Sequence, residues 1–297
     1  MANLKEVKNR ISSVQSTQQI TKAMKMVAAS KLRRAQERIE KIRPYADKLT
    51  SILENVSSGN KEMTESIAYA QQRQVDRVLL VVVTSDRGLC GAFNNNALKM
   101  FTQTVEENYK RQHEAGFLWV LPVGRKALEF VKRRGYQVIS DYSELFHDLT
   151  FDTAAPAAEL AMDGFVSGKY DKVEIIYNSF RNVAMQILKR ETFLPIKPAE
   201  VAEQAQELET DYIYEPSKEF IVEELIPKSL KIQFYKAILD SNASEHGARM
   251  TAMEQATDNA GELIKQLQLT YNRTRQAAIT NEILEIVAGA EALRASK

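Results

Sequence analysis

Cysteine, histidine and long apolar runs are all scarce in this chain of 297 residues. A single cysteine, Cys90, excludes an intramolecular disulfide, and the three histidines are scattered, without the spacing typical of metal ligands. The longest apolar run, Val78 to Val83, is far shorter than the roughly 18 residues that a membrane-spanning helix needs. We therefore expect no disulfide, no bound metal and membrane contact only through partners.

An excess of one charge is absent as well. The 40 Lys and Arg residues balance 39 Asp and Glu residues, which argues against a dedicated nucleic-acid binder. The charges balance over the whole chain but not within every segment, because residues 5–43 hold 11 basic and 3 acidic residues. A basic coiled-coil protein that binds nucleic acid therefore remains an alternative, although a solvated helix face explains the same charges.

Residues 3–57 have the pattern of one long helix with a continuous seam. Mostly apolar or small residues recur at alternating spacings of three and four without a slip, which predicts pairing with a second helix. Pro44 lies inside this pattern and predicts a local bend. The seam consists of Leu4, Val7, Ile11, Val14, Gln18, Thr21, Lys25, Ala28, Leu32, Ala35, Ile39, Ile42, Ala46, Leu49, Leu53 and Val56.

A second helical seam occupies the C-terminal end of the chain. Its positions are Leu239, Ala243, His246, Met250, Met253, Thr257, Ala260, Ile264, Leu267, Tyr271, Thr274 and Ala278. From Ile279 to Leu293 apolar residues surround the helix on several faces, which predicts enclosure by a partner. The helix has two possible starts. One is near Ser217, and the other is at Asn242, where a capping-box pattern follows the interruption at Pro227.

The middle of the chain has the alternation of an α/β domain. Strands are predicted at 78–83, 117–122, 136–139 and 172–177, helices at 96–113, 124–134 and 154–166, and an antiparallel strand at 183–193. Residues 195–215 are predicted to form an irregular acidic connection. The predicted fold is a Rossmann-like, mostly parallel sheet domain (75–217) inserted between two ends (1–57 and 218–297) that form a long antiparallel coiled coil.

The loop after the first strand is the one place that suggests a ligand. Thr84 to Asn94 carries two glycines at a strand's carboxyl end, where open sheets commonly bind ligands. Gly88 and Gly91 do not form GxGxxG, and no GxxxxGK[ST] occurs, so a nucleotide-dependent enzyme with helical arms stays an alternative only. We expect a tight turn in which glycine takes positive φ and Asp86 caps the next helix.

No catalytic, cofactor-binding or metal-binding residue is predicted anywhere in the chain. Cys90 has no histidine near it in sequence and is interpreted as a half-buried, inert thiol. His246 falls on the C-terminal seam, where a packed side chain is the favoured interpretation. The residues therefore favour a structural or interaction protein over an enzyme.

Three blocks carry a family resemblance. They are Leu4–Leu32, Thr84–Asn94, and a C-terminal block made of Ser244–Asn259 and Tyr271–Ala290. Together and in this order they resemble the gamma chain of rotary ATP synthases. Residues from about 101 to 227 match this family by position alone.

The resemblance implies a fold and a role. In the family, the antiparallel coiled coil enters a ring of alternating alpha and beta subunits. The α/β domain lies at its foot, against the epsilon subunit and the membrane c-ring. Rotation of this shaft couples proton flow to ATP synthesis or hydrolysis, and the chain itself is not catalytic and needs no cofactor. The expected location is peripheral, on the cytoplasmic face of the bacterial cell membrane, which fits an N-terminus without a targeting pattern.

Two groups of site residues follow from the resemblance. Polar or sulfur-containing shaft positions that match contacts with the beta subunits are Met24, Arg249, Arg275, Gln276, Thr280 and Glu282. Apolar positions expected to act as a bearing at the tip are Ile286, Val287, Ala290 and Leu293. The chain lacks the two-cysteine segment of plant-type gamma chains, so redox control of that kind is not expected.

Overall fold

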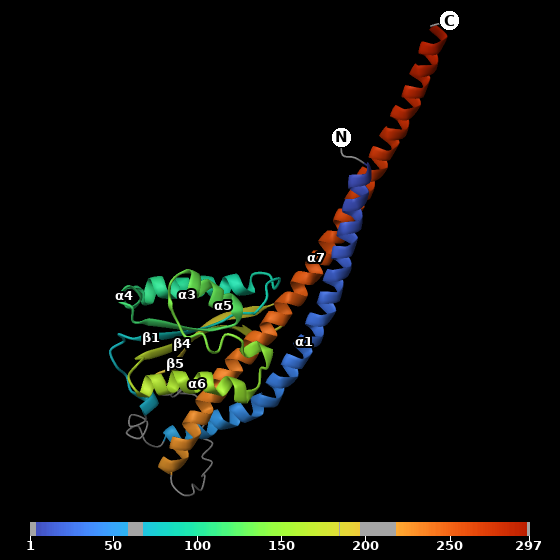
Figure 1. Ribbon diagram of the computed structural model, residues 1–297. Coiled ribbons are helices and arrows are strands. Elements are labelled where there is room, and N and C mark those ends of the chain that lie inside the picture. Colours follow the sequence, from blue (N-terminus) through green and yellow to red (C-terminus); the bar gives the residue numbers. More distant parts are fainter. Residues whose placement is uncertain (1–3, 59–67, 184, 197–217, 296–297) are drawn as a thin grey trace. The chain divides into compact units, whose positions relative to one another are not determined.

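The computed structural model describes residues 4–58, 68–183, 185–196 and 218–295, without the side chains of 47, 50–58, 218–223 and 293–295. Of the predicted acidic connection, 197–215 lie outside the residues that the structure describes. Two compact units are present, one of Met1–Val27 with Met250–Lys297 and the other of Ala28–Arg249. Two long helices contribute to both units. They are α1 (Leu4–Ser58) and α7 (Lys218–Ala295) (Figure 1).

Both long helices continue through an internal proline. Pro44 lies inside α1 and Pro227 inside α7, where each removes one backbone hydrogen bond without ending the helix. The structure therefore decides between the two starts that the sequence left open. Asn242 does not begin a helix, because α7 already runs continuously from Lys218, and Glu245 of the apparent capping box pairs with Arg249 instead.

Contacts between the helices in the first unit establish an antiparallel coiled coil. Lys25 Nζ lies 2.6 Å from Glu254 Oε1, and the hydroxyls of Thr21 and Thr257 are 2.8 Å apart. Gln18 Nε2 donates to the Thr257 carbonyl at 3.4 Å. Positions rise along α1 as they fall along α7, so the predicted antiparallel pairing is confirmed.

The seam predicted for α1 is also confirmed from Leu4 to Leu49. Every seam position in this range is buried or half-buried, whereas Ile20, Met26 and Val27 beside it are 57–63% exposed. On α7 the seam is covered as far as Thr274, but Ala278 is exposed. The expectation for Ala278 is wrong, and the seam ends one position earlier; Leu53 and Val56 lie outside the described side chains.

The second unit contains a five-stranded sheet with the order β3-β2-β1-β4-β5. All neighbouring pairs are parallel except β4 and β5, so the predicted mostly parallel sheet is confirmed. The strands are β1 (Val78–Val83), β2 (Leu118–Val123), β3 (Gln137–Val138), β4 (Lys172–Phe180) and β5 (Gln186–Leu194). The helices between them are α3 (Phe93–Asn108), α4 (Lys110–Glu114), α5 (Arg125–Arg133) and α6 (Phe151–Val166), with 3-10 turns at Ala68–Ala70 and Leu145–His147.

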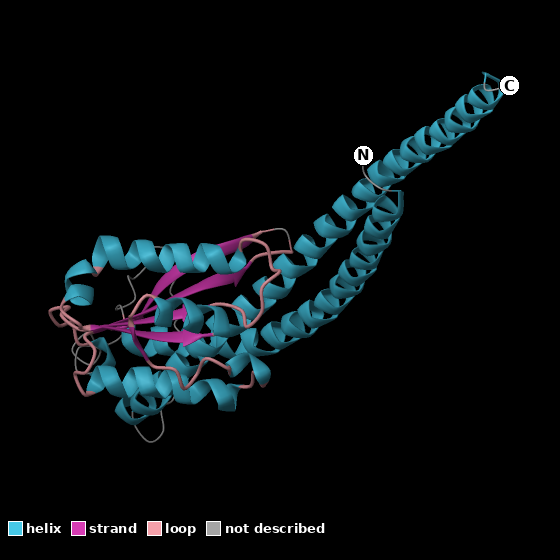
Figure 2. Ribbon diagram, turned by 45° about the horizontal axis from the view of Figure 1, so that its top comes forward, coloured by secondary structure: helices cyan, strands magenta, loops and turns pink. Residues whose placement is uncertain are grey.

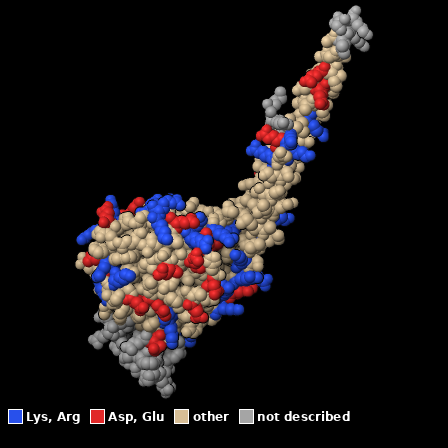
Figure 3. Space-filling model, viewed as in Figure 1, with Lys and Arg blue, Asp and Glu red and all other residues tan. Residues whose placement is uncertain are grey.

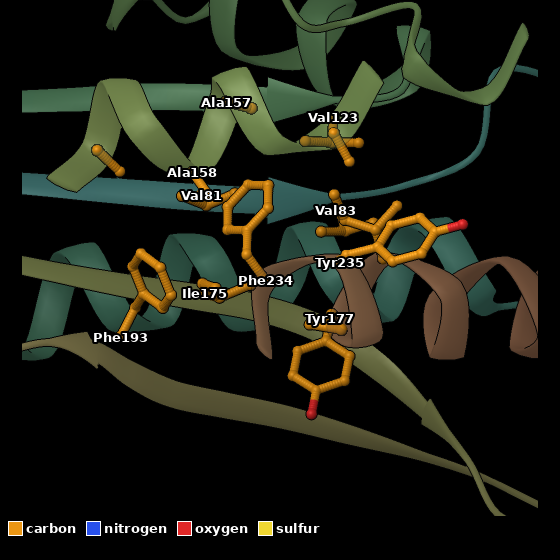
Figure 4. Packing of buried hydrophobic residues seen from close by; sticks show 14 of the residues in the cluster. Val81, Val83, Val123, Ala157, Ala158, Ile175, Tyr177, Phe193, Phe234 and Tyr235 are labelled. Atoms are coloured by element: carbon orange, nitrogen blue, oxygen red, sulfur yellow. The ribbon is translucent and has the colours of Figure 1, made fainter. Parts of the chain in front are cut away.

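Helices cover both faces of this sheet (Figure 2). On one face Val78, Leu80 and Val82 pack against α3 and α5. On the other face Leu79, Val81 and Val83 belong to a larger cluster with α6 and with the parts of α1 and α7 in this unit. Figure 4 shows Phe193 of β5 and Phe234 of α7 in that cluster, with ring centres 5.7 Å apart. The strand β1 is therefore buried on both sides, as its continuous apolar run predicts.

Leu32 offers a test of this packing. It is 4% exposed within the larger cluster, so Leu32→Ala should lower the free energy of unfolding by about 2–5 kcal/mol through lost transfer energy and a cavity. Met26→Ala is the control, since Met26 is 63% exposed, and should change it by less than about 0.5 kcal/mol. Urea unfolding of the isolated chain measures both; equal effects would contradict the assigned seam.

Candidate functional site

The carboxyl edge of the sheet is the place where α/β folds of this kind bind ligands. The strand order reverses between β1 and β4, and the crevice outside their carboxyl ends is the usual site. Here α7 contacts the end of β4 and the loop beyond β1. Ser179 Oγ on β4 donates to Asp240 Oδ2 at 3.2 Å, and Arg249 Nη2 donates to the carbonyl of Arg87, beyond β1, at 3.0 Å. The chain's own helix therefore crosses this edge.

The loop between β1 and α3 is tied to the neighbouring helix α5. Thr84 Oγ1 accepts from the backbone N–H of Ala127 at 2.8 Å, and Asp86 Oδ1 accepts from that of Arg125 at 3.1 Å. Asp86 thus caps α5, and the expectation that it caps the next helix, α3, is wrong. The reason is topological, because β1 and β2 are parallel neighbours and the N-terminus of α5 lies beside the end of β1.

The same loop is also fixed internally. The Ser85 N–H donates to Asn94 Oδ1 at 2.9 Å, and Asn94 Nδ2 donates to Cys90 Sγ at 3.3 Å. Cys90 is only 1% exposed, so it is fully buried rather than half-buried as expected. Gly91 takes the expected positive φ of 59°, but the other positive φ, 64°, belongs to Leu89 and not to Gly88. The turn is therefore a packed structure held by side chains.

Glu245, His246 and Arg249 form a polar group on the face of α7 at this edge. The side chains of Glu245 and Arg249 form an ion pair and are only 8% and 12% exposed. Burial raises the pKa of Glu245, while the Arg249 guanidinium opposes the rise. Burial, reinforced by the positive charges of Arg249 and of Lys31 on α1, lowers the pKa of His246 to about 4. His246 is therefore neutral at pH 7, in agreement with the predicted packed side chain.

His246 gives a pH-dependent prediction. Its folded pKa of about 4 lies below the unfolded value of 6.5, so between these values the unfolded chain binds more protons and stability rises with pH. His246→Gln should remove at most about 3 kcal/mol of this rise, the equivalent of the pKa gap. Urea unfolding at pH 4.5, 5.5 and 7 compares the two chains. An identical pH dependence would mean that His246 is already charged or exposed when folded.

The residues predicted to contact other subunits lie in two different places. Met24 is half-buried on α1, and Arg275, Gln276, Thr280 and Glu282 are exposed on α7, all in the first unit. Thr280 Oγ1 donates to the Gln276 carbonyl of its own helix at 2.9 Å. Arg249 belongs to the second unit, where it binds the chain's own loop. The sequence did not predict these internal bonds, although the four-residue spacing of Glu245 and Arg249 is a signal for their pairing.

The tip of α7 is apolar and exposed. Ile286 and Val287 are 71% and 49% exposed, Ala290 is also exposed, and the side chain of Leu293 lies outside the described part. Toward this end of the helix the surface in Figure 3 is mostly uncharged, interrupted by acidic side chains. Ile279, Ile283 and Leu284 extend the exposed apolar surface toward the seam.

A cavity of about 790 Å³ lies elsewhere in the second unit, where β4 begins and β5 ends. Its lining includes Asp171, Lys172, Glu174 and Arg190. Lys172 Nζ lies 2.9 Å from Glu174 Oε1, and Arg190 Nε lies 3.9 Å from its other oxygen. Because these charges already balance one another, the cavity indicates no particular ligand.

Among the residues that the structure describes, no group of three or more His, Cys, Asp and Glu side chains is placed to hold a metal ion. Within the same residues, no helix is both long and apolar enough to cross a membrane.

Comparison with known proteins identifies the family. The sequence pattern of the family described as ATP synthase matches residues 3–293. The ATP synthase gamma chain of Cytophaga hutchinsonii is 58% identical over 294 residues, with 99% of each chain covered. The gamma chain of Flavobacterium johnsoniae is 54% identical over 295 residues, again with 99% of each covered. This chain belongs to the ATP synthase gamma-chain family.

Solved structures agree with the fold. The central stalk and c-ring structure of the Tetrahymena thermophila mitochondrial ATP synthase contains a chain with a TM-score of 0.58 and 26% identity. The match covers 80% of this chain and 99% of that one. A chain of the Euglena gracilis mitochondrial ATP synthase has a TM-score of 0.66 at 22% identity, covering 99% and 95%, which supports the fold.

Proposed function

We propose that this chain is the central rotor shaft of a rotary ATP synthase. It couples proton flow through the membrane ring to ATP synthesis or hydrolysis in the alpha and beta subunits. The observation that carries the proposal is the helix pair itself, in a chain of the gamma family. One end of α7 is built into the sheet domain, whereas beyond Thr274 the helix exposes an apolar surface that no other residue of the described part of the chain covers.

The exposed part of α7 supports insertion into a ring of other subunits. Ile279, Ile283, Leu284, Ile286 and Val287 are 48–71% exposed. Large apolar side chains exposed on several faces of one helix promote association in water, so they favour enclosure by partners. Apolar contact is weakly directional, so such a surface can turn within a ring without being trapped at one angle.

Polar side chains below the tip are suited to contacts that depend on angle. We assign Arg275, Gln276, Thr280 and Glu282 on α7, and Met24 on α1, to contacts with the beta subunits. Contacts that differ among beta subunits in different conformations shift the populations of those conformations as the shaft turns. Ile286, Val287, Ala290 and Leu293 serve as the bearing. Arg249 is a separate case because its guanidinium is already engaged inside the chain.

The sheet domain is assigned to the foot of the shaft, against the epsilon subunit and the c-ring, on the cytoplasmic face of the bacterial membrane. Catalysis belongs to the alpha and beta subunits. The competing proposal of a nucleotide-dependent enzyme is disfavoured because α7 crosses the edge where a nucleotide would bind. Titration of the isolated chain with ATP tests that alternative, and saturable binding lost on Gly91 substitution would support it.

Co-purification tests the proposed function directly. The tagged chain, produced together with alpha and beta subunits, should carry both subunits through purification and salt washing. The purified complex, joined to the membrane sector in vesicles, should transport protons when ATP is supplied. A control chain that ends at Arg249 keeps the sheet unit and loses the exposed end of α7. It should therefore neither retain the alpha and beta subunits nor support proton transport. Retention of neither subunit by the full chain would reject the proposal.

A further inference from the structure

Arg249 is the point at which α7 is bonded to the loop beyond β1. Its guanidinium donates to the carbonyl of Arg87 at 3.0 Å and to that of Gly88 at 3.3 Å, and it pairs with the carboxylate of Glu245. A planar guanidinium carries five N–H donors in a fixed fork and can serve all three acceptors at once. The Glu245 carboxylate balances its charge where both side chains are nearly buried.

The loop that Arg249 holds is firmly part of the sheet domain. Asp86 binds the first N–H of α5, Thr84 binds that of Ala127, and Asn94 of α3 binds Ser85. A force applied to this loop is therefore carried directly to α3 and α5. Arg249 adds α7 to the same network.

Directional bonds and apolar packing resist different movements. Phe234, Ile238, Leu239 and Ala243 of α7 lie in the larger apolar cluster, which opposes separation of the helix from the domain. Apolar burial depends on area and has little directional preference, so it opposes twisting of the helix about its own axis less well. Hydrogen bonds weaken steeply when their angles change, so the bonds of Arg249 oppose that twist.

We propose that the Glu245–Arg249 pair is a torsional clasp that transmits turning force between α7 and the sheet domain. Arg249 is the last residue of α7 within the second compact unit, so the clasp lies where the helix leaves that unit. The inference rests on the proposed rotor function. It gives Arg249 a role within the chain, as a positioning residue for the shaft, in place of the contact with beta subunits suggested by the family resemblance.

The test uses the assembled enzyme in vesicles and the double variant Glu245→Gln/Arg249→Gln. Both charges are removed together, so neither is left buried without its partner. ATP hydrolysis should continue while proton transport per ATP falls, because the domain slips relative to the helix. Two amides report on the loop in the isolated chain. The Ser85 N–H donates to Asn94, and the Phe93 N–H donates to the Cys90 carbonyl at 3.3 Å. Hydrogen exchange at both should accelerate about tenfold or more in the double variant, as expected for loss of a charge-assisted bond that holds the loop.

Two single variants complete the design. Arg249→Lys keeps the charge beside Glu245 but offers no planar fork, so its proton transport per ATP should lie between the values of the natural chain and the double variant. It also serves if the double variant does not fold. Glu254→Gln removes the exposed ion pair with Lys25, in which Glu254 is 51% exposed, and should leave both measurements unchanged.

The outcomes separate the clasp from the rotor function itself. If the natural chain does not drive proton transport, the proposed function fails. If the natural chain couples and the double variant couples equally, the clasp is wrong and the rotor function stands. If coupling is lost while the Ser85 and Phe93 amides keep their protection, Arg249 acts through something other than its bonds to the loop beyond β1, and the clasp is again wrong.

Discussion

Gly124→Ala should lower the free energy of unfolding of the chain by at least about 3 kcal/mol, among the largest effects expected of a single methyl group. Gly124 lies between β2 and α5 with φ of 99° and ψ of 143°, a backbone conformation that residues with a Cβ atom rarely adopt. An added Cβ would meet the Thr84 carbonyl oxygen at 2.2 Å. The clash is with backbone at the end of β1, so it cannot be relieved by moving a flexible side chain.

Two other glycines separate the effect of backbone strain from that of a steric clash. Gly135 has φ of 75° with nothing within 4 Å of an added Cβ, so Gly135→Ala should lower the free energy of unfolding by about 1 kcal/mol. Gly88 has free space and no positive φ, and Gly88→Ala should change stability by less than about 0.5 kcal/mol. Thermal unfolding of the three variants should rank them in this order. Similar losses for Gly124 and Gly135 would show that the Thr84 contact is unimportant.

Arg275→Ala/Gln276→Ala should reduce the ATP turnover of the assembled enzyme by about tenfold or more while the complex remains intact. Both side chains are exposed, so the isolated chain should keep its stability. A lost bond to a charged group is worth enough to change a rate by that factor if it is stronger in the transition state. Steady-state ATPase assays on complexes of verified composition measure the effect.

Deleting Glu285–Lys297 should have the opposite pattern. It removes the assigned bearing, so assembly or coupling should weaken, yet part of the ATPase activity that depends on rotation should remain. The deletion and the double substitution are each other's controls. The division between a bearing and angle-dependent contacts is wrong if the deletion abolishes all activity in an intact complex while Arg275→Ala/Gln276→Ala has no effect.

The helices and the sheet could be predicted from the sequence because their patterns are local. The seam of α1 is set by positions every three or four residues, and the apolar run of β1 reflects burial on both faces. The start of α7 was ambiguous because Pro227 and the residues around Asn242 have good local reasons to end one helix and begin another. Packing in the larger apolar cluster overrides both, with Leu230 and Phe234 buried just beyond the proline.

The candidate site was only partly predictable. The loop from Thr84 to Gly91 could be recognised as a turn at a strand end, but the cap of Asp86 on α5 depends on which strands are neighbours. The bonds of Arg249 to the Arg87 and Gly88 carbonyls join residues more than 160 positions apart and leave no pattern in the sequence. The exposed end of α7 was predictable from its many apolar faces, because that signal again lies within one helix.

Rotation of the sheet domain tests most directly whether this chain is the rotor shaft. Arg111 on α4 is exposed and Cys90 is buried, so Arg111→Cys offers a specific thiol for an optical probe. With the alpha and beta subunits fixed to a surface, supplying ATP should turn the probe continuously in one direction, and removing ATP should stop it. Hydrolysis at the full rate by complete complexes whose probe stays still would contradict the assignment of this chain as the rotor shaft.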